Sequence, residues 1–224
     1  MGKNSEATNE VTEDNIKAVK EFLRAVEQLY KDKSAVENLR LKTKAPGLLA
    51  ELYVVEKLYE KYHEGYKLFW LGGGKRYKDI ELVNKKNDKE VYGVQVKSIT
   101  KKIMPEGACC GRSGCYGYMI RHDSWSNYGE RTKEGYLQLD VNKVKEGDVK
   151  LREKFEYPFI FVLLEDIGNP QFFVYSREEM SNSWDQLVCG HNAFLKRYMN
   201  GNTTNTHFCI DPVGHRDQFD KIFV

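Results

Sequence analysis

Two short β-favouring runs, at residues 78–83 and 91–98, constrain the fold of this chain more than any other feature of its sequence. Each run either alternates apolar and polar residues or is β-favouring throughout, as strands are. The segment 85–89 between them reads Lys-Lys-Asn-Asp-Lys, which is polar enough to turn the chain. The sequence therefore predicts a β-hairpin.

Three polar side chains on this predicted hairpin are expected to converge on one face. Gln95 and Lys97 stand two apart on the second strand, and strand side chains alternate with a period of two. A paired first strand brings Asp79 to the same face. Asp79, the Gln95 side-chain carbonyl and the Val96 main-chain carbonyl offer the oxygen ligands that Mg²⁺ prefers. Lys97 beside such an ion could orient or deprotonate a water, or stabilise charge on a phosphate, which is the chemistry of phosphodiester hydrolysis.

A helix and a strand are predicted ahead of the hairpin. Pro46 and Gly47 favour a helix start, and apolar residues follow at helical spacing. This helix carries Glu51, and Glu56 on the same helix competes with it for any role at a metal. The aromatic and apolar run 66–71 predicts the strand. The expected order is helix, strand, strand, strand.

These residues resemble the PD-(D/E)xK nuclease superfamily. Asp79 is followed 16 positions later (95 − 79 = 16) by Gln95-Val96-Lys97 on an apolar strand, and Glu51 resembles the first-helix acid of many of those nucleases. Glutamine in place of the usual acid resembles the Mrr-like restriction branch. The resemblance covers residues 45–100. The plain alternative is that each residue is a solvated polar side chain.

The resemblance implies an α/β, restriction-endonuclease-like fold, in which helices flank a mixed central sheet, with N-terminal helices and an inserted loop region. It implies Asp79 as the main Mg²⁺ ligand, Gln95 as a neutral ligand or positioner and Glu51 as an auxiliary acid. Lys97 would orient water and stabilise charge. We expect one nuclease domain over 1–224, with N-terminal helices at 1–45, the catalytic core at 46–100, an inserted loop at 101–135, and the rest of the sheet with C-terminal helices at 136–224.

Further elements follow from local patterns. Thr12 predicts the cap of a first helix, and Ser176 with Glu179 predicts a capping box. The remaining predicted helices lie at 34–41, 140–154, 189–199 and 216–223, and the remaining strands at 136–139, 159–164, 171–175 and 207–210.

The net charge of +2 is only weakly basic, so a nucleic-acid surface would require local segregation of charge. Segment 100–133 has no clean period and mixes basic with aromatic residues, which predicts a DNA-facing loop. An ordered surface insertion with a small aromatic core is the alternative. The candidate DNA-binding residues are Lys75, Arg76, Lys101, Lys102, Arg112, Arg121 and Arg131.

Five cysteines and no export signal argue against a disulfide framework. Cys109, Cys110 and Cys115, with His122, match no usual zinc spacing, and reduced loop cysteines are expected. His191, Asn192 and His207 do not follow the HNH nuclease pattern. No apolar run is long enough to span a bilayer and the first nine residues are polar, so a cytoplasmic protein is expected.

Together these features predict a Mg²⁺-dependent endonuclease acting on double-stranded DNA, and first a sequence-specific type II restriction enzyme. Two-fold symmetry of a palindromic target would call for a homodimer, and such a system would include a cognate DNA methyltransferase. A structure-selective junction or repair nuclease is one alternative. A non-catalytic nucleic-acid-binding module with a nuclease-like fold is the other.

Overall fold

The structure is a computed structural model that describes residues 10–32, 34, 45–72, 78–99, 116–121, 129–131, 133, 137–139, 157–180, 205–210 and 213–224. Contacts divide the chain into two compact units. The first comprises Met1–Ser98, Phe159–Gln171 and Phe223, and the second Ile99–Pro158, Phe172–Ile222 and Val224. The predicted single-domain organisation stays a prediction.

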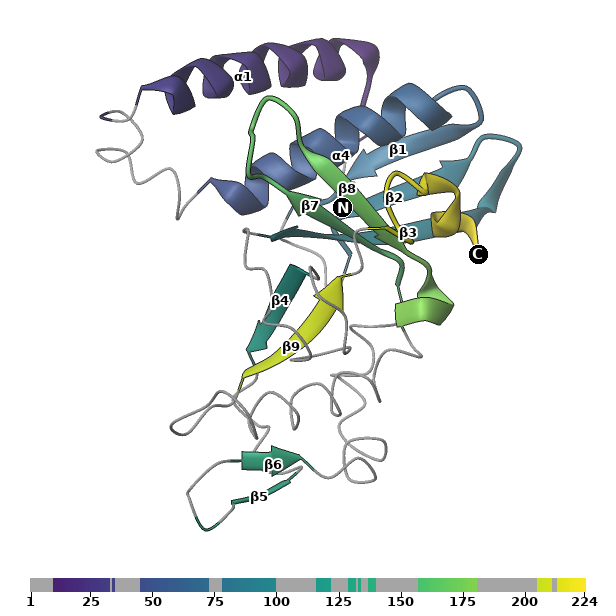
Figure 1. Cartoon of the computed structure of the whole chain (residues 1–224). Coiled ribbons are helices and arrows are strands. Elements are labelled where there is room, and N and C mark those ends of the chain that lie inside the picture. The colour runs from purple at the N-terminus through teal and green to yellow at the C-terminus, as the bar shows by residue number, and fades with distance from the viewer. Residues whose placement is uncertain are drawn as a thin grey trace, which may run out of the picture. The chain divides into compact units, whose positions relative to one another are not determined.

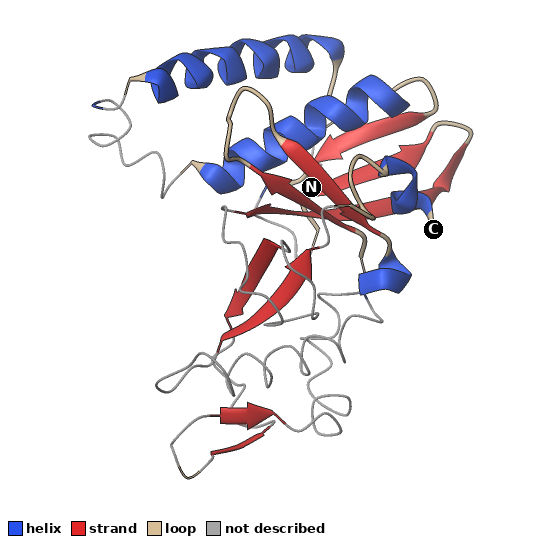
Figure 2. Cartoon of the chain, in the orientation of Figure 1, coloured by secondary structure: helices blue, strands red, loops and turns tan. Residues whose placement is uncertain are grey.

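A five-stranded sheet is the main β-structure (Figures 1 and 2). Its order is β1 (Tyr66–Trp70), β2 (Ile80–Asn84), β3 (Asn87–Ile99), β7 (Phe159–Leu163) and β8 (Gln171–Tyr175). β2 pairs antiparallel with both β1 and β3. The predicted α/β class with a mixed sheet and helices is confirmed, whereas a specifically restriction-endonuclease-like fold stays a prediction.

The predicted hairpin is confirmed as β2 and β3, with a shorter turn than expected. Ile80 pairs with Val94, and β3 already begins at Asn87. The Asn84 side chain explains the tight turn, because its Oδ1 accepts a hydrogen bond from the Lys86 amide at 2.9 Å. Asparagine side chains often close turns in this way. The polar segment 85–89 therefore contains the turn, but the turn is shorter than predicted because β3 begins at Asn87.

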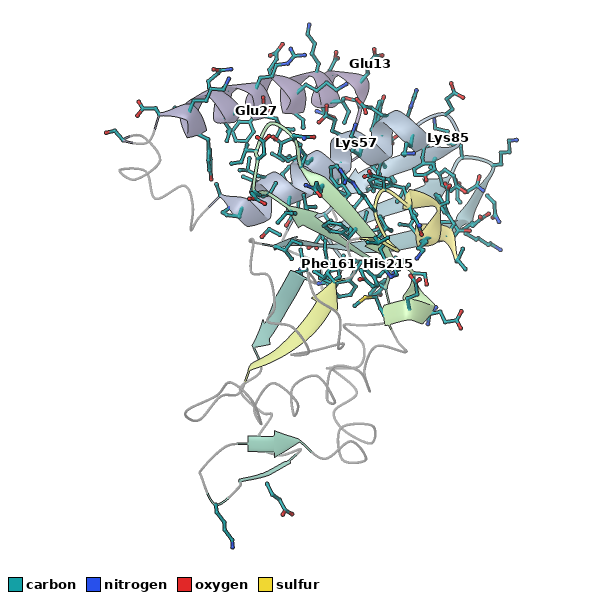
Figure 3. All side chains as sticks on the ribbon, viewed as in Figure 1. Glu13, Glu27, Lys57, Lys85, Phe161 and His215 are labelled. Carbon is teal, nitrogen blue, oxygen red and sulfur yellow. The ribbon has the colours of Figure 1, made fainter. Side chains whose placement is uncertain are left out.

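Alternation along the hairpin and a continuous apolar run in β7 form the core of the sheet. Ile80, Leu82 and Val94 are fully buried, as are most side chains of β7. A central strand covered on both faces is expected to be apolar at consecutive positions, and the Phe-Ile-Phe-Val-Leu sequence of β7 meets this requirement. Phe161, labelled in Figure 3, is one of these buried residues.

Two helices pack in layers beside the sheet. α1 (Glu13–Lys31) begins after Thr12, which forms the expected cap as part of a capping box with Asn15. α4 (Pro46–Tyr62) has proline in its first turn, as predicted. α4 contacts α1 on one side and β1 and β7 on the other (Figure 1). Buried apolar side chains line α4, so this helix is fixed relative to the strands it covers.

In the second unit, β4 (Tyr116–Arg121) pairs antiparallel with β9 (Asn205–Ile210), and β5 (Gly129–Arg131) with β6 (Leu137–Leu139). The prediction of irregular structure throughout 100–133 was therefore wrong at β4 and β5. The partner of β4 lies far along the chain, so no local hairpin pattern indicates it.

The predicted C-terminal helix over 216–223 is shorter than expected. Only a 3₁₀ helix, η4 (Phe219–Phe223), forms there. Arg216 instead makes a β-bridge with Phe173, and Asp217 has a φ of 56°. A non-glycine residue in this left-handed region cannot continue a right-handed helix.

Several predicted elements lie outside the described residues, namely the helices at 140–154 and 189–199 and, beyond Ser34, the one at 34–41. Within the described part of the chain, no helix is long and apolar enough to cross a membrane.

Candidate functional site

Asp79 is fixed where β2 begins. Its amide donates to the Val94 carbonyl at 2.8 Å, and its carbonyl accepts from the Leu71 amide at 2.9 Å. Its side-chain Oδ2 accepts from the Val96 amide at 2.7 Å. Val96 lies on the stretch of β3 beyond the last β2 partner, Ile80, so the carboxylate occupies the place of a missing strand neighbour.

This arrangement leaves the second carboxylate oxygen of Asp79 for another partner. Among the described residues, no hydrogen bond reaches Oδ1, and Asp79 is only 8% exposed. A buried carboxylate normally has its lone pairs satisfied by partners or by a cation. The Val96 amide therefore fixes one carboxylate oxygen of Asp79, and no described residue hydrogen-bonds to the other.

Lys97 meets Asp79 as the sequence predicts. Its Nζ lies 3.6 Å from Asp79 Oδ2. The lysine side chain retains 30% exposure, against 12% for the aspartate side chain. The amine is thus the more accessible member of the ion pair, and a phosphate could approach it.

Gln95 lies on β3 between Val94 and Val96, the two residues whose backbone groups hydrogen-bond to Asp79. It is 9% exposed, and no residue in the described part of the structure hydrogen-bonds to its carboxamide. Leaving a buried amide without a partner costs about 1–3 kcal/mol. Among the described residues, Gln95 is therefore a buried amide whose hydrogen-bonding groups are available to a ligand.

Glu51 of α4 binds Trp70, which pairs with Ile80, the residue after Asp79. Its Oε2 accepts a hydrogen bond from Trp70 Nε1 at 2.9 Å. Burial raises the pKa of the Glu51 carboxyl group, the Trp70 hydrogen bond lowers that pKa, Asp79 raises it and Lys97 lowers it. Glu51 is therefore close enough to Asp79 and Lys97 to be influenced by both charges.

Glu56, the competing acid of the same helix, faces a different environment. It lies 3.8 Å from Lys20 of α1. Burial raises the pKa of Glu56, as does Glu60, whereas Lys20, Lys57 and Arg24 lower it. Figure 3 labels Lys57 on α4. Glu56 belongs to the contact between the two helices, which leaves Glu51 as the acid near the candidate site.

The strand register assigns Trp70 and the β3 residues of the site to different faces of the sheet. Trp70 pairs with Ile80 and shares its face, whereas alternation puts Gln95 and Lys97 on the other face. Asp79 precedes the first residue of β2, so strand alternation does not determine which face its side chain occupies. Trp70 was not among the predicted site residues; its position at the end of the strand before Asp79 was the available signal.

The donor set suits a hard divalent cation. Asp79 and Glu51 supply carboxylates, and Gln95 and the Val96 carbonyl supply neutral oxygens, which are ligand types of Mg²⁺. In the described part of the chain, no group of three or more His, Cys, Asp or Glu residues could hold a metal ion. A cation here would therefore need the neutral oxygens and water in addition to the two acids.

The predicted DNA-binding residues are only partly described. Arg121 and Arg131 belong to strands β4 and β5. Lys78, another cation beside Asp79, forms an ion pair with Glu81. The other candidates, Lys75, Arg76, Lys101, Lys102 and Arg112, lie outside the described residues, as do Cys109, Cys110, Cys115, His122, His191 and Asn192.

Comparison of the chain with protein-family models, with curated proteins and with solved structures finds no match. Function is therefore inferred from these residues and their geometry.

Proposed function

We propose that this protein is a Mg²⁺-dependent endonuclease that hydrolyses phosphodiester bonds of double-stranded DNA. The observation that carries the proposal is the pair formed by Asp79 and Lys97, 3.6 Å apart at the end of a buried strand. The proposal is supported by Gln95, a buried amide two positions from Lys97 to which no described residue hydrogen-bonds, and by Glu51, a carboxylate influenced by the charges of Asp79 and Lys97.

Each residue has a role in this proposal. Asp79, Gln95 through its side-chain oxygen and Val96 through its carbonyl would hold the cation, and Glu51 would be an auxiliary acid. Bound Mg²⁺ would polarise the phosphate and activate a water molecule. Lys97 orients that water and stabilises negative charge as the water oxygen bonds to phosphorus and the bond to the leaving sugar oxygen breaks. The Val96 amide keeps Asp79 in place throughout.

Within this class, a sequence-specific type II restriction endonuclease is our first choice. The chain carries a second unit of strands and loops beyond the first, which offers surface for target recognition. A homodimer would match a palindromic site. A cognate methyltransferase that protects the host DNA would complete such a system.

Incubation of the purified protein with plasmid DNA tests the proposal. We expect discrete linear fragments with Mg²⁺, none with a chelator, and much slower cleavage by Lys97→Ala. Cleavage of branched DNA but not of plasmid would indicate a junction or repair nuclease instead. DNA binding without cleavage in Mg²⁺, Mn²⁺ or Ca²⁺ would contradict catalysis and support a binding module.

A further inference from the structure

Trp70, the last residue of β1, links that strand to α4 through its indole. Its Nε1 donates a hydrogen bond to Oε2 of Glu51, and both side chains are partly buried. An indole N–H donates but does not accept, so it can orient a carboxylate without competing for a cation. Among the described residues, no hydrogen bond reaches the other carboxylate oxygen, Oε1. That oxygen is left for a further partner.

The charges that act on this carboxylate come from two other elements. Trp70 pairs with Ile80, the residue after Asp79, and the amide of Leu71, the residue after Trp70, donates to the Asp79 carbonyl at 2.9 Å. Asp79 precedes β2 and Lys97 belongs to β3, and both charges influence Glu51. The indole therefore holds Glu51 beside the proposed cation position. Without the indole hydrogen bond, rotation about the three side-chain bonds of Glu51 could turn its carboxylate toward water.

We propose that Trp70 is a positioning residue of this site, which holds the Glu51 carboxylate beside Asp79 through its indole N–H. The inference rests on the proposed function. Partners that hydrogen-bond to a metal ligand fix its orientation, and losing one typically costs about 10- to 100-fold in metal affinity or activity. A bond that merely joined α4 to β1 would affect folding stability and leave the Mg²⁺ requirement unchanged.

The test compares Trp70→Phe with a matched control on the same strand. Trp70→Phe keeps an aromatic ring and loses the N–H. Tyr66→Phe also removes one polar hydrogen from an aromatic residue of β1, and no described residue hydrogen-bonds to that hydroxyl. We expect Trp70→Phe to raise the half-saturating Mg²⁺ concentration about tenfold and Tyr66→Phe to change it less than about twofold. In a Glu51→Gln background, Trp70→Phe should add less than about twofold.

A spectroscopic measurement supplies a readout other than cleavage. The ¹H–¹⁵N indole resonance of Trp70, assigned by its through-bond and through-space connections to the Trp70 backbone, should shift saturably with Mg²⁺ in the wild-type protein and not in Glu51→Gln. If Trp70→Phe fails to fold, this comparison carries the test, and a shift of wild-type size in Glu51→Gln overturns the inference.

The outcomes separate the two proposals. A saturable Mg²⁺ response in the wild type that Trp70→Phe leaves within about twofold overturns the role of Trp70 alone. The absence of any saturable Mg²⁺ response in the wild type overturns the proposed function, and the role of Trp70 with it.

Discussion

Lys97 with Asp79 in the first unit and Lys221 with Glu179 in the second are two lysine–carboxylate pairs with different surroundings. The nitrogen–oxygen distance is 3.6 Å in the first pair and 2.6 Å in the second. Asp79 is nearly buried, whereas the Glu179 side chain is 36% exposed. In the second pair, which is shorter and more exposed, both carboxylate oxygens of Glu179 accept hydrogen bonds.

The second pair belongs to a network of hydrogen bonds and a ring contact within the second unit. The Glu179 amide donates to Ser176 Oγ at 3.1 Å, and the Ser176 amide donates to Glu179 Oε2 at 2.8 Å, which confirms the predicted capping box. Lys221 also contacts His215 Nδ1 at 3.0 Å, and the His215 ring, labelled in Figure 3, stacks on Tyr175. These contacts anchor the C-terminal segment within its unit.

Opposite pKa shifts express the difference between the two regions. Burial by itself raises the pKa of Glu179, but hydrogen bonds from Lys221 and the Ser176 backbone outweigh it, and the net pKa is lowered. For Glu51, burial prevails and the pKa is raised. The hydrogen bonds around Glu179 already stabilise the ionised form of its carboxyl group. The ionised form of Glu51 is destabilised by burial, and an added positive charge would stabilise it. This contrast distinguishes a folding contact from a candidate cation site.

Lys97→Ala should produce the largest effect. Removing the positive charge at a developing phosphate charge is expected to lower the cleavage rate by about 10²- to 10³-fold, with DNA binding largely retained. Single-turnover cleavage and DNA-binding titrations measure the two quantities. Lys221→Ala is the matched control and should cut DNA at the wild-type rate. Equal losses in both variants would show that the comparison has no functional meaning.

Gln95→Glu tests whether the Gln95 side chain, to which no described residue hydrogen-bonds, is a Mg²⁺ ligand. An added carboxylate should bind Mg²⁺ at least as tightly as the wild type, by up to about tenfold, because it brings a further negative charge to the cation. The metal-free variant should be less stable, since it buries an extra charge. Calorimetric Mg²⁺ titration and the Mg²⁺-induced change in thermal midpoint measure these effects. Weaker Mg²⁺ binding would argue against Gln95 as a ligand.

Ser176→Ala addresses the structural region. Losing this helix cap should reduce the free energy of unfolding by about 1 kcal/mol. Chemical denaturation measures that loss, and a Mg²⁺ titration should give the wild-type half-saturation. A changed Mg²⁺ requirement would mean that the capping network does more than support the fold.

The pH dependence of stability gives the smallest effect and should differ in sign between the regions. The raised pKa of Glu51 means that ionisation costs stability as the pH rises through its folded pKa. Glu51→Gln should therefore be more stable than the wild type at neutral pH, by less than about 1 kcal/mol. This advantage should vanish at a pH below the unfolded pKa of the carboxyl group.

Glu179→Gln should behave in the opposite way. The lowered pKa of Glu179 contributes stability above its unfolded pKa, which is lost as the pH falls through the folded pKa. At neutral pH the variant should be less stable by a few tenths of a kcal/mol, since solvent screens this exposed pair. Denaturation curves across acidic and neutral pH measure both variants. A shift of the same sign in both would contradict the assigned environments.

Several elements could be predicted because their signals are local. Thr12 and Pro46 marked the starts of α1 and α4, and Ser176 with Glu179 marked a capping box. β4 could not be predicted, because its partner strand, β9, lies far along the chain. The start of η4 at Phe219 was also missed, since it depends on the conformation of Asp217.

The sequence by itself determined that Gln95 and Lys97 share one face of a strand and that Asp79 stands at the start of its neighbour, because the alternation of a strand follows from its covalent geometry. Only the tertiary structure decided that Glu51, and not Glu56, is influenced by the charge of Asp79, and that Glu51 hydrogen-bonds to Trp70. The distance between side chains of different elements depends on how a helix packs on a sheet, and no local pattern records that packing.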